Sequence, residues 1–172
     1  DVVDGGAGND AITAAAGDDN LSGGAGDDSF VMAANYTTSD TIAGGDGTDT
    51  MTVTNTAAVT AGTTTGVETM TVTVDTDSDT LALAKVSGLT TLVPTSGTDS
   101  STLNVTGLNS GATVKLNDAD VDTATIDTAA SASLTIDTQI ALAGSTTITD
   151  AVSVTVQNTG SAAGDLDRKS VV

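Results

Sequence analysis

The sequence predicts an all-β chain that folds as a parallel β-solenoid, in which short strands coil around a narrow core. Nine-residue units rich in glycine and aspartate follow one another near the N-terminus, and threonine alternates with apolar residues after them. The chain has 172 residues but one Phe, one Tyr and no Trp, which leaves little bulk for a thick globular core. A thin, repetitive interior suits this composition.

The repeat is clearest in two units that begin at Gly5 and at Gly23. Gly5–Thr13 reads GGAGNDAIT, and Gly23–Val31 reads GGAGDDSFV. A degenerate unit, Ala14–Ser22, lies between them in phase, and a fourth unit spans Gly44–Thr52. We expect each unit to make one tight glycine turn and one short strand, so that two nine-residue units complete one coil.

Each unit places an apolar residue two positions after an aspartate. These apolar side chains should point inward and stack into the core, as Val3, Ile12, Leu21 and Phe30. Three extra residues in the segment from Met32 to Ser39 interrupt the nine-residue step.

The same periodicity stacks acidic residues. Residues two units apart should lie above one another at the roughly 4.8 Å spacing of neighbouring strands, which places Asp1 on Asp19 and Asp10 on Asp28. Two carboxylates this close repel each other. A hard cation between them, with turn carbonyls completing a shell of about six to eight oxygens, would convert this repulsion into a stabilising contact.

These units resemble the RTX calcium-binding nonapeptide, whose pattern is Gly-Gly-x-Gly-x-Asp-x-apolar-x. The resemblance covers roughly residues 1–52 and implies a β-roll with calcium as its cofactor. Residue by residue, it implies that one ion is held by carbonyls of the two glycine turns and by two carboxylates: Gly5, Ala7, Asp10, Gly23, Ala25 and Asp28. A second site would use Asp1 and Asp19.

Two departures from the pattern limit these assignments. Ala14 and Ala15 replace glycines, and the insertion after Phe30 breaks the stack. Asp49 is a further candidate ligand, but the sequence does not show which row would partner Asp40 or Asp49.

From residue 53 to 164 we expect a Thr-rich β-solenoid, with two strands in each rung of about 20 residues, and we expect residues 165–172 to form a tail or linker. A β-sandwich of short antiparallel strands is the alternative for this second part. Pro94 should mark an edge or a turn. Two acidic trios, at 75, 77 and 79 and at 118, 120 and 122, are either solvated turns or further calcium sites at a subunit contact.

Charge and composition exclude several function classes. The net charge of −19 excludes nucleic acid as a partner, and no apolar run approaches the roughly 20 residues needed to span a bilayer, so membrane insertion is not expected. With no His and no Cys, the chain lacks the usual nucleophile–base pairs, and we do not expect an enzyme. The absence of Cys also leaves any stability outside the cell to packing or metal.

The acidic repeats followed by a Thr-rich region also resemble bacterial surface-layer proteins. This resemblance implies a structural, self-assembling segment at the extracellular bacterial cell surface, whose folding and assembly depend on calcium. Its partners would be calcium ions, other copies in a homo-oligomer or lattice, and a candidate cell-surface glycan. The alternative is a calcium-triggered folding module of an exoprotein or adhesin exported by type I secretion.

Overall fold

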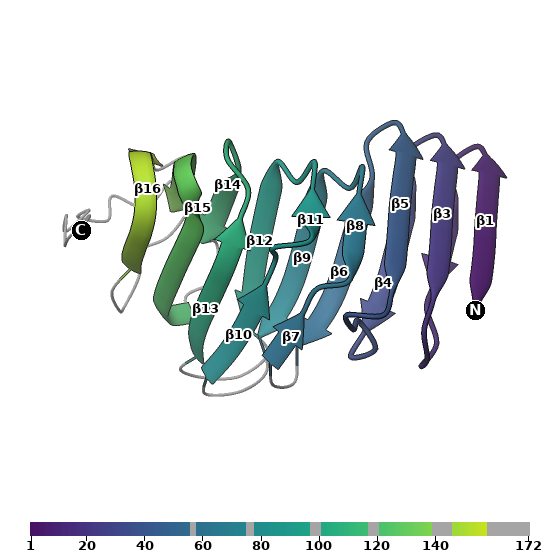
Figure 1. Ribbon diagram of the computed structural model, residues 1–172, viewed down its shortest axis with the longest axis horizontal. Helices are drawn as coiled ribbons and strands as arrows, with labels where there is room; N and C mark the ends of the chain where they lie inside the picture. Colours follow the sequence, from purple (N-terminus) through teal and green to yellow (C-terminus); the bar gives the residue numbers. More distant parts are fainter. Residues whose placement is uncertain (56–57, 75–77, 97–100, 117–120, 139–145, 158–172) are drawn as a thin grey trace.

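The computed structural model describes residues 1–55, 58–74, 78–96, 101–116, 121–138 and 146–157. It is an elongated coil of parallel strands, with β1 at one end and β16 at the other (Figure 1). The tail predicted at 165–172 and the acidic positions 75, 77, 118 and 120 lie outside the described residues.

Five short strands form one face of the coil. In spatial order they are β1 (Val2–Ala7), β3 (Asn20–Ala25), β5 (Thr41–Asp46), β8 (Thr63–Thr65) and β11 (Val86–Ser87).

The remaining strands belong to a second, larger sheet. Its order is β2 (Ala11–Thr13), β4 (Ser29–Ala33), β6 (Thr50–Asn55), β9 (Thr69–Val74), β12 (Thr91–Ser96), β14 (Thr113–Leu116), β15 (Val121–Thr138), β13 (Ser101–Leu108), β10 (Ser78–Ala82) and β7 (Ala58–Thr60), and β16 (Thr146–Gln157) also pairs with β15.

Every strand pairing among the described residues is parallel, which confirms the predicted β-solenoid. The second part continues the coil and does not form a β-sandwich. Strand β6 crosses the boundary predicted between residues 52 and 53, and it pairs with β4 on one side and β9 on the other. One hydrogen-bonded sheet therefore joins the two parts.

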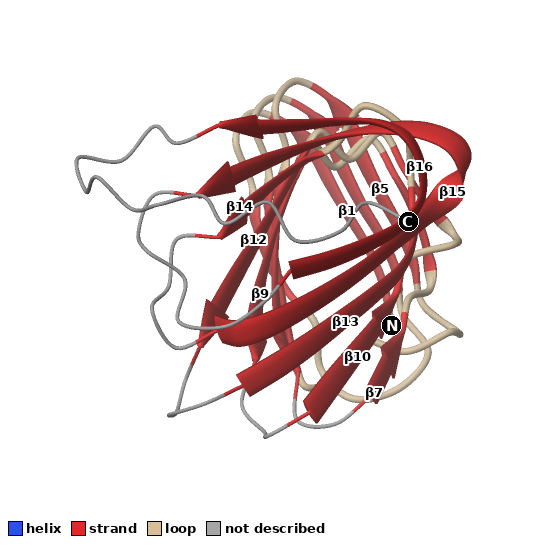
Figure 2. Cartoon of the chain, turned by 90° about the vertical axis from the view of Figure 1, so that its left-hand side faces the viewer, coloured by secondary structure: helices blue, strands red, loops and turns tan. Residues whose placement is uncertain are grey.

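The length of a rung changes along the coil. The first rung consists of two nine-residue units, as predicted, since Val2 pairs with Asn20. The next two rungs are longer by three and four residues, since Asn20 pairs with Thr41 and Thr41 with Thr63. The expectation of two strands per rung is wrong beyond β6. There the longer rungs add a third side made of β7, β10 and β13, opposite β9, β12 and β14 in the end-on view (Figure 2).

The core is a ladder of apolar side chains that occupy equivalent positions in successive rungs. The register of the larger sheet aligns the longest ladder, all of whose members are at most 6% exposed: Ile12, Phe30, Met51, Met70, Leu92, Val114 and Ile136. Burial of each large apolar side chain contributes roughly 1.5–3 kcal/mol. The predicted core residues Ile12, Leu21 and Phe30 are buried, whereas Val3 is 38% exposed because β1 has a neighbour only on the β3 side.

Pro94 was predicted to mark an edge or a turn, and it lies inside β12, not at a turn. It pairs in register with Val72 of β9, and its side chain is buried. The pairing of β12 with β14 involves only Thr91 and Leu92. Pro94 therefore lies where the ladder on that side has ended, so its missing N–H leaves no gap in the pairing with β14.

The inserted segment places a tyrosine inside the coil. Tyr36 is 4% exposed, and its hydroxyl lies 2.6 Å from Oγ1 of Thr64, a fully buried residue of β8, and 3.4 Å from the Gly62 carbonyl oxygen. Burial raises the pKa of Tyr36 to about 12, against a smaller opposing effect of the hydrogen bond with Thr64. The residues that broke the predicted repeat thus fill the interior where the rungs lengthen.

Tyr36 is the only tyrosine, and the chain has no Trp, so its ionisation can be followed by ultraviolet absorbance. We expect a midpoint near pH 12 instead of the ordinary 10.0. Because the folded pKa is raised, its stabilising contribution should be complete below pH 10 and be lost as the pH rises to about 12. Tyr36→Phe should abolish the signal, and a midpoint at 10 in folded protein would contradict the buried position.

Close stacking as well as the backbone angle requires glycine at the second position of the units that begin at Gly23 and Gly44. Gly24 has φ +109°, and a Cβ there would collide with the carbonyl oxygen of Gly6 in the rung before. Gly6 has φ +94°, but no atom lies within 4 Å of its Cβ position.

We therefore expect Gly6→Ala to lower the free energy of unfolding by about 1–3 kcal/mol through backbone strain alone. Gly24→Ala should lower it clearly more, because it adds the collision. Urea unfolding of both variants in calcium-containing buffer measures the difference. Equal losses would show that the rungs do not stack as closely as described.

Candidate metal sites in the stacked turns

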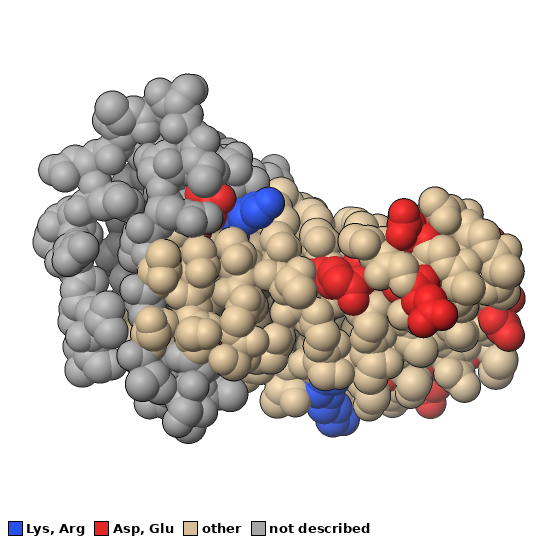
Figure 3. Space-filling model, turned by 90° about the horizontal axis from the view of Figure 1, so that it is seen from above, with Lys and Arg blue, Asp and Glu red and all other residues tan. Residues whose placement is uncertain are grey.

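Two columns of acidic residues run along the coil, each at the residue before a strand. The first column consists of Asp10, Asp28, Asp49 and Glu68, which precede β2, β4, β6 and β9. The second column consists of Asp1, Asp19 and Asp40, which precede β1, β3 and β5. Viewed from above, acidic side chains gather over the end of the coil that carries these rungs (Figure 3). Parallel pairing thus places carboxylates from successive rungs in line.

In the first column, the backbone holds one carboxylate oxygen of Asp28, Asp49 and Glu68. The Asp10 N–H donates to Oδ1 of Asp28 at 2.8 Å, and the Asp28 N–H donates to Oδ1 of Asp49 at 2.7 Å. The Asp49 N–H donates to Oε2 of Glu68 at 2.8 Å. Each of these three side chains therefore accepts a hydrogen bond from the rung before its own, which fixes its position.

The second oxygen of these aspartates has no partner. Oδ2 of Asp10, Asp28 and Asp49 is buried without a hydrogen bond, and the Asp28 and Asp49 side chains are 1% and 0% exposed. Burying a carboxylate oxygen without a partner is costly. Burial raises the pKa of Asp49, reinforced by the charges of Asp28 and Glu68 and opposed by its backbone hydrogen bond. A cation bound beside these oxygens would compensate their buried negative charge.

Each unpartnered oxygen points into a space beside a glycine. A Cβ on Gly5 would lie 2.6 Å from the Gly23 carbonyl oxygen and 2.7 Å from Oδ2 of Asp10. At Gly23 it would lie 2.6 Å from the Gly44 carbonyl oxygen and would collide with Oδ2 of Asp28. In each of these rungs, a carbonyl oxygen and a carboxylate oxygen thus lie close to the position that a Cβ atom on the glycine would occupy.

Calcium fits this arrangement, because it prefers a shell of hard oxygen ligands that includes carboxylates and backbone carbonyls. No three acidic side chains gather at one point within the described ranges, so each site would depend on turn carbonyls for much of its shell. The three glycine spaces, beside Gly5, Gly23 and Gly44, are named here the cradles of the first column.

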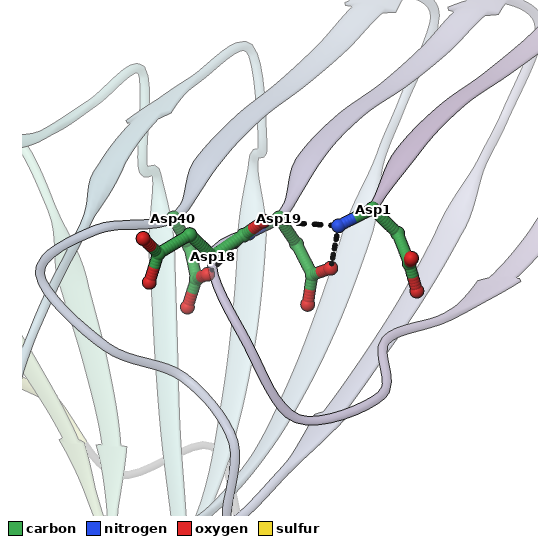
Figure 4. Close-up of polar contacts among 4 residues, drawn as sticks. All are labelled: Asp1, Asp18, Asp19 and Asp40. Carbon is green, nitrogen blue, oxygen red and sulfur yellow. Dashed lines mark hydrogen bonds and ion pairs between the residues drawn. The ribbon is translucent and has the colours of Figure 1, made fainter.

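The second column is less complete. Asp1 donates through its nitrogen to Oδ1 of Asp19 at 2.8 Å, and the Asp19 N–H donates to Oδ1 of Asp40 at 2.9 Å (Figure 4). Oδ2 of Asp19 is buried without a partner, but Oδ2 of Asp40 accepts the Thr37 N–H at 2.7 Å. This column therefore offers one unpartnered carboxylate oxygen where the first column offers three.

The predicted pairs of aspartates lie above one another in the structure, which also shows which residues lie beneath Asp40 and Asp49. Asp10 lies beneath Asp28 and Asp1 beneath Asp19, as predicted, and the lengthened second rung places Asp40 on Asp19 and Asp49 on Asp28. Their role as ligands stays a prediction.

The predicted carbonyl ligands differ in their surroundings. The Gly23 carbonyl oxygen faces the cradle beside Gly5, whereas the Ala25 carbonyl oxygen accepts the Gly8 N–H at 2.7 Å. Ala7 lies in β1 in register with Ala25.

Sequence reasoning missed Glu68 as a member of the first column. Glu68 is the only glutamate of the chain, it follows Gly66 by two residues, and it precedes an alternating Thr-apolar strand. This is the same order of glycine, acid and strand as in the repeats, but at an irregular offset and with a different acid.

A family model of the RTX calcium-binding nonapeptide repeat matches residues 1–30 and 37–53, in four copies. The interruption coincides with the segment that carries Tyr36. Comparison with curated proteins and with solved structures found no match. In the part of the chain that the structure describes, no helix has the length and apolar character to cross a membrane.

The family match agrees with the stacked turns and with the buried carboxylate oxygens that have no hydrogen-bond partner. It also agrees with the carbonyl oxygens that face the cradles. Repeats of this kind bind calcium and occur in secreted bacterial proteins, which points to an extracellular protein. Residues 1–30 and 37–53 of this chain are RTX calcium-binding nonapeptide repeats.

Proposed function

We propose that this chain is a calcium-dependent structural segment of a self-assembling bacterial surface layer. The observation that carries the calcium dependence is the set of buried, unpartnered oxygens of Asp10, Asp28 and Asp49 in the first column. The proposal assigns no catalytic role to the segment.

Calcium would act as a switch on folding. Without the ion, closing the coil brings the carboxylates of successive rungs together, with no positive charge between them. A ligand that binds only the folded state stabilises it by RT ln(1 + [L]/Kd). Extracellular calcium modules have dissociation constants of about 10⁻⁴–10⁻³ M, so the chain would stay open where calcium is scarce and fold where it is abundant.

The outer face of the larger sheet supports a lattice role. Its register aligns six threonines, one from each of six strand segments, in a single row: Thr50, Thr69, Thr91, Thr113, Thr135 and Thr155. A rod that presents the same side chain on six neighbouring strand segments offers a regular surface for side-by-side packing of copies. A net charge of −19 keeps such rods apart until cations reduce the repulsion.

A calcium-triggered folding module of an exoprotein or adhesin exported by type I secretion is the second candidate. The two acidic columns are confined to the rungs up to β9, so calcium would close one end of the coil, from which the later rungs could extend. Such a module requires folding but no assembly.

Calcium titration of the chelated protein distinguishes these functions. We expect circular dichroism to show a gain of β structure and light scattering to show the later growth of large particles. Folding to a lone monomer would favour the secretion module. No response, or an equal response to magnesium, would contradict the calcium sites.

Two neighbouring aspartates provide matched variants for this titration. Asp28→Asn retains an oxygen to accept the Asp10 N–H but removes the charge of the buried Oδ2, and we expect it to weaken calcium binding about tenfold or more. Asp27→Asn removes the same charge from an exposed position and should shift the titration little. Equal shifts would indicate that general charge, not the cradle, governs folding.

A further inference from the structure

The first column does not end with the last repeat. The family match stops at residue 53, yet Glu68 lies one rung further along and accepts the Asp49 N–H through Oε2 at 2.8 Å. Asp28 and Asp49 accept the N–H of the preceding aspartate in the same way. Glu68 thus occupies the position of the next aspartate, within a turn that lacks the nonapeptide pattern.

The space below Glu68 has the features of the cradles before it. Oδ2 of Asp49 is buried without a partner, and the Asp49 side chain is 0% exposed. A Cβ on Gly44 would collide with both this oxygen and the Gly66 carbonyl oxygen. An unpartnered carboxylate oxygen and a carbonyl oxygen therefore converge beside Gly44, and Gly66 belongs to the Thr-rich part of the chain.

The turn that carries Glu68 is joined to the strands on both sides. The Asp49 carbonyl oxygen accepts the N–H groups of Glu68 and Thr69 at 3.1 and 3.2 Å. The Glu68 carbonyl oxygen accepts the N–H groups of Thr90 and Thr91, both at 2.9 Å. Anything that orders this turn therefore also orders the starts of β9 and β12.

We propose that a further calcium ion binds between the Gly44–Asp49 turn and the turn at Gly66–Glu68. Asp49 Oδ2 and the Gly66 carbonyl oxygen are its ligands, and Glu68 supplies the second negative charge. This ion couples calcium binding in the RTX repeats to folding of the Thr-rich solenoid. The inference rests on the proposed calcium-dependent function and extends it beyond the residues of the family match.

Glu68→Gln in the full chain tests the site, because glutamine retains an oxygen for the Asp49 N–H but loses the charge. Calorimetric titration with calcium should show one ion fewer, or one ion bound about tenfold or more weakly. Hydrogen exchange should show that calcium protects the amides of β9 and β12 less than in the unsubstituted chain. Asp4→Asn is the control for the loss of one carboxylate charge, since Asp4 is exposed in β1, outside both turns of this site, and it should change neither measurement.

Gly44→Ala provides a second variant that leaves Glu68 intact and fills the cradle. The backbone angle of Gly44 does not require glycine, so its effect would come from the occupied space. If either variant retains every calcium ion at unchanged affinity and the same protection of β9 and β12, the further site is wrong, while the calcium sites of the repeats stand. If the unsubstituted chain binds no calcium, the proposed function itself fails.

Discussion

The fold depends on the stacking of like charges in register. A parallel coil places each residue above its equivalent in the next rung, so an aspartate repeated at the same position becomes a column of carboxylates. Backbone N–H groups hold one oxygen of Asp28 and of Asp49, but the other oxygen is buried without a partner. A bound cation would remove this cost, and under the proposed function the stability of the first rungs depends on such an ion.

Glycine makes such a column possible, because the space beside Gly5, Gly23 and Gly44 is open only in the absence of a side chain. Where glycines are missing, the column weakens. The second column, with Ala14 and Ala15 in its turn, has one unpartnered carboxylate oxygen. The apolar ladder runs through the acidic rungs as well and continues beyond Glu68, where packing and strand pairing hold the rungs.

Sequence reasoning could predict the parallel coil because two periodicities are written directly in the residues: the nine-residue spacing of Asp10, Asp19 and Asp28, and the alternation in the later strands. It could not predict the third side, because that side begins with a strand of three residues, Ala58–Thr60, and alternation alone does not show on which side of the coil a later strand lies. The three extra residues before Asp40 are visible in the sequence, but only the register shows that a single rung contains them, which is what places Asp40 on Asp19 and Asp49 on Asp28. Glu68 was missed because it breaks both the spacing and the residue type of the repeat.

Calcium binding in the cradles can be tested by a crystal structure grown in calcium, with the ions located by their anomalous scattering. We expect an ion beside Gly23, with Oδ2 of Asp28 and the Gly44 carbonyl oxygen at the roughly 2.3–2.6 Å distances typical of calcium. A coil that closes with water, a side chain or no atom in that space would show that the stacked carboxylates do not hold calcium.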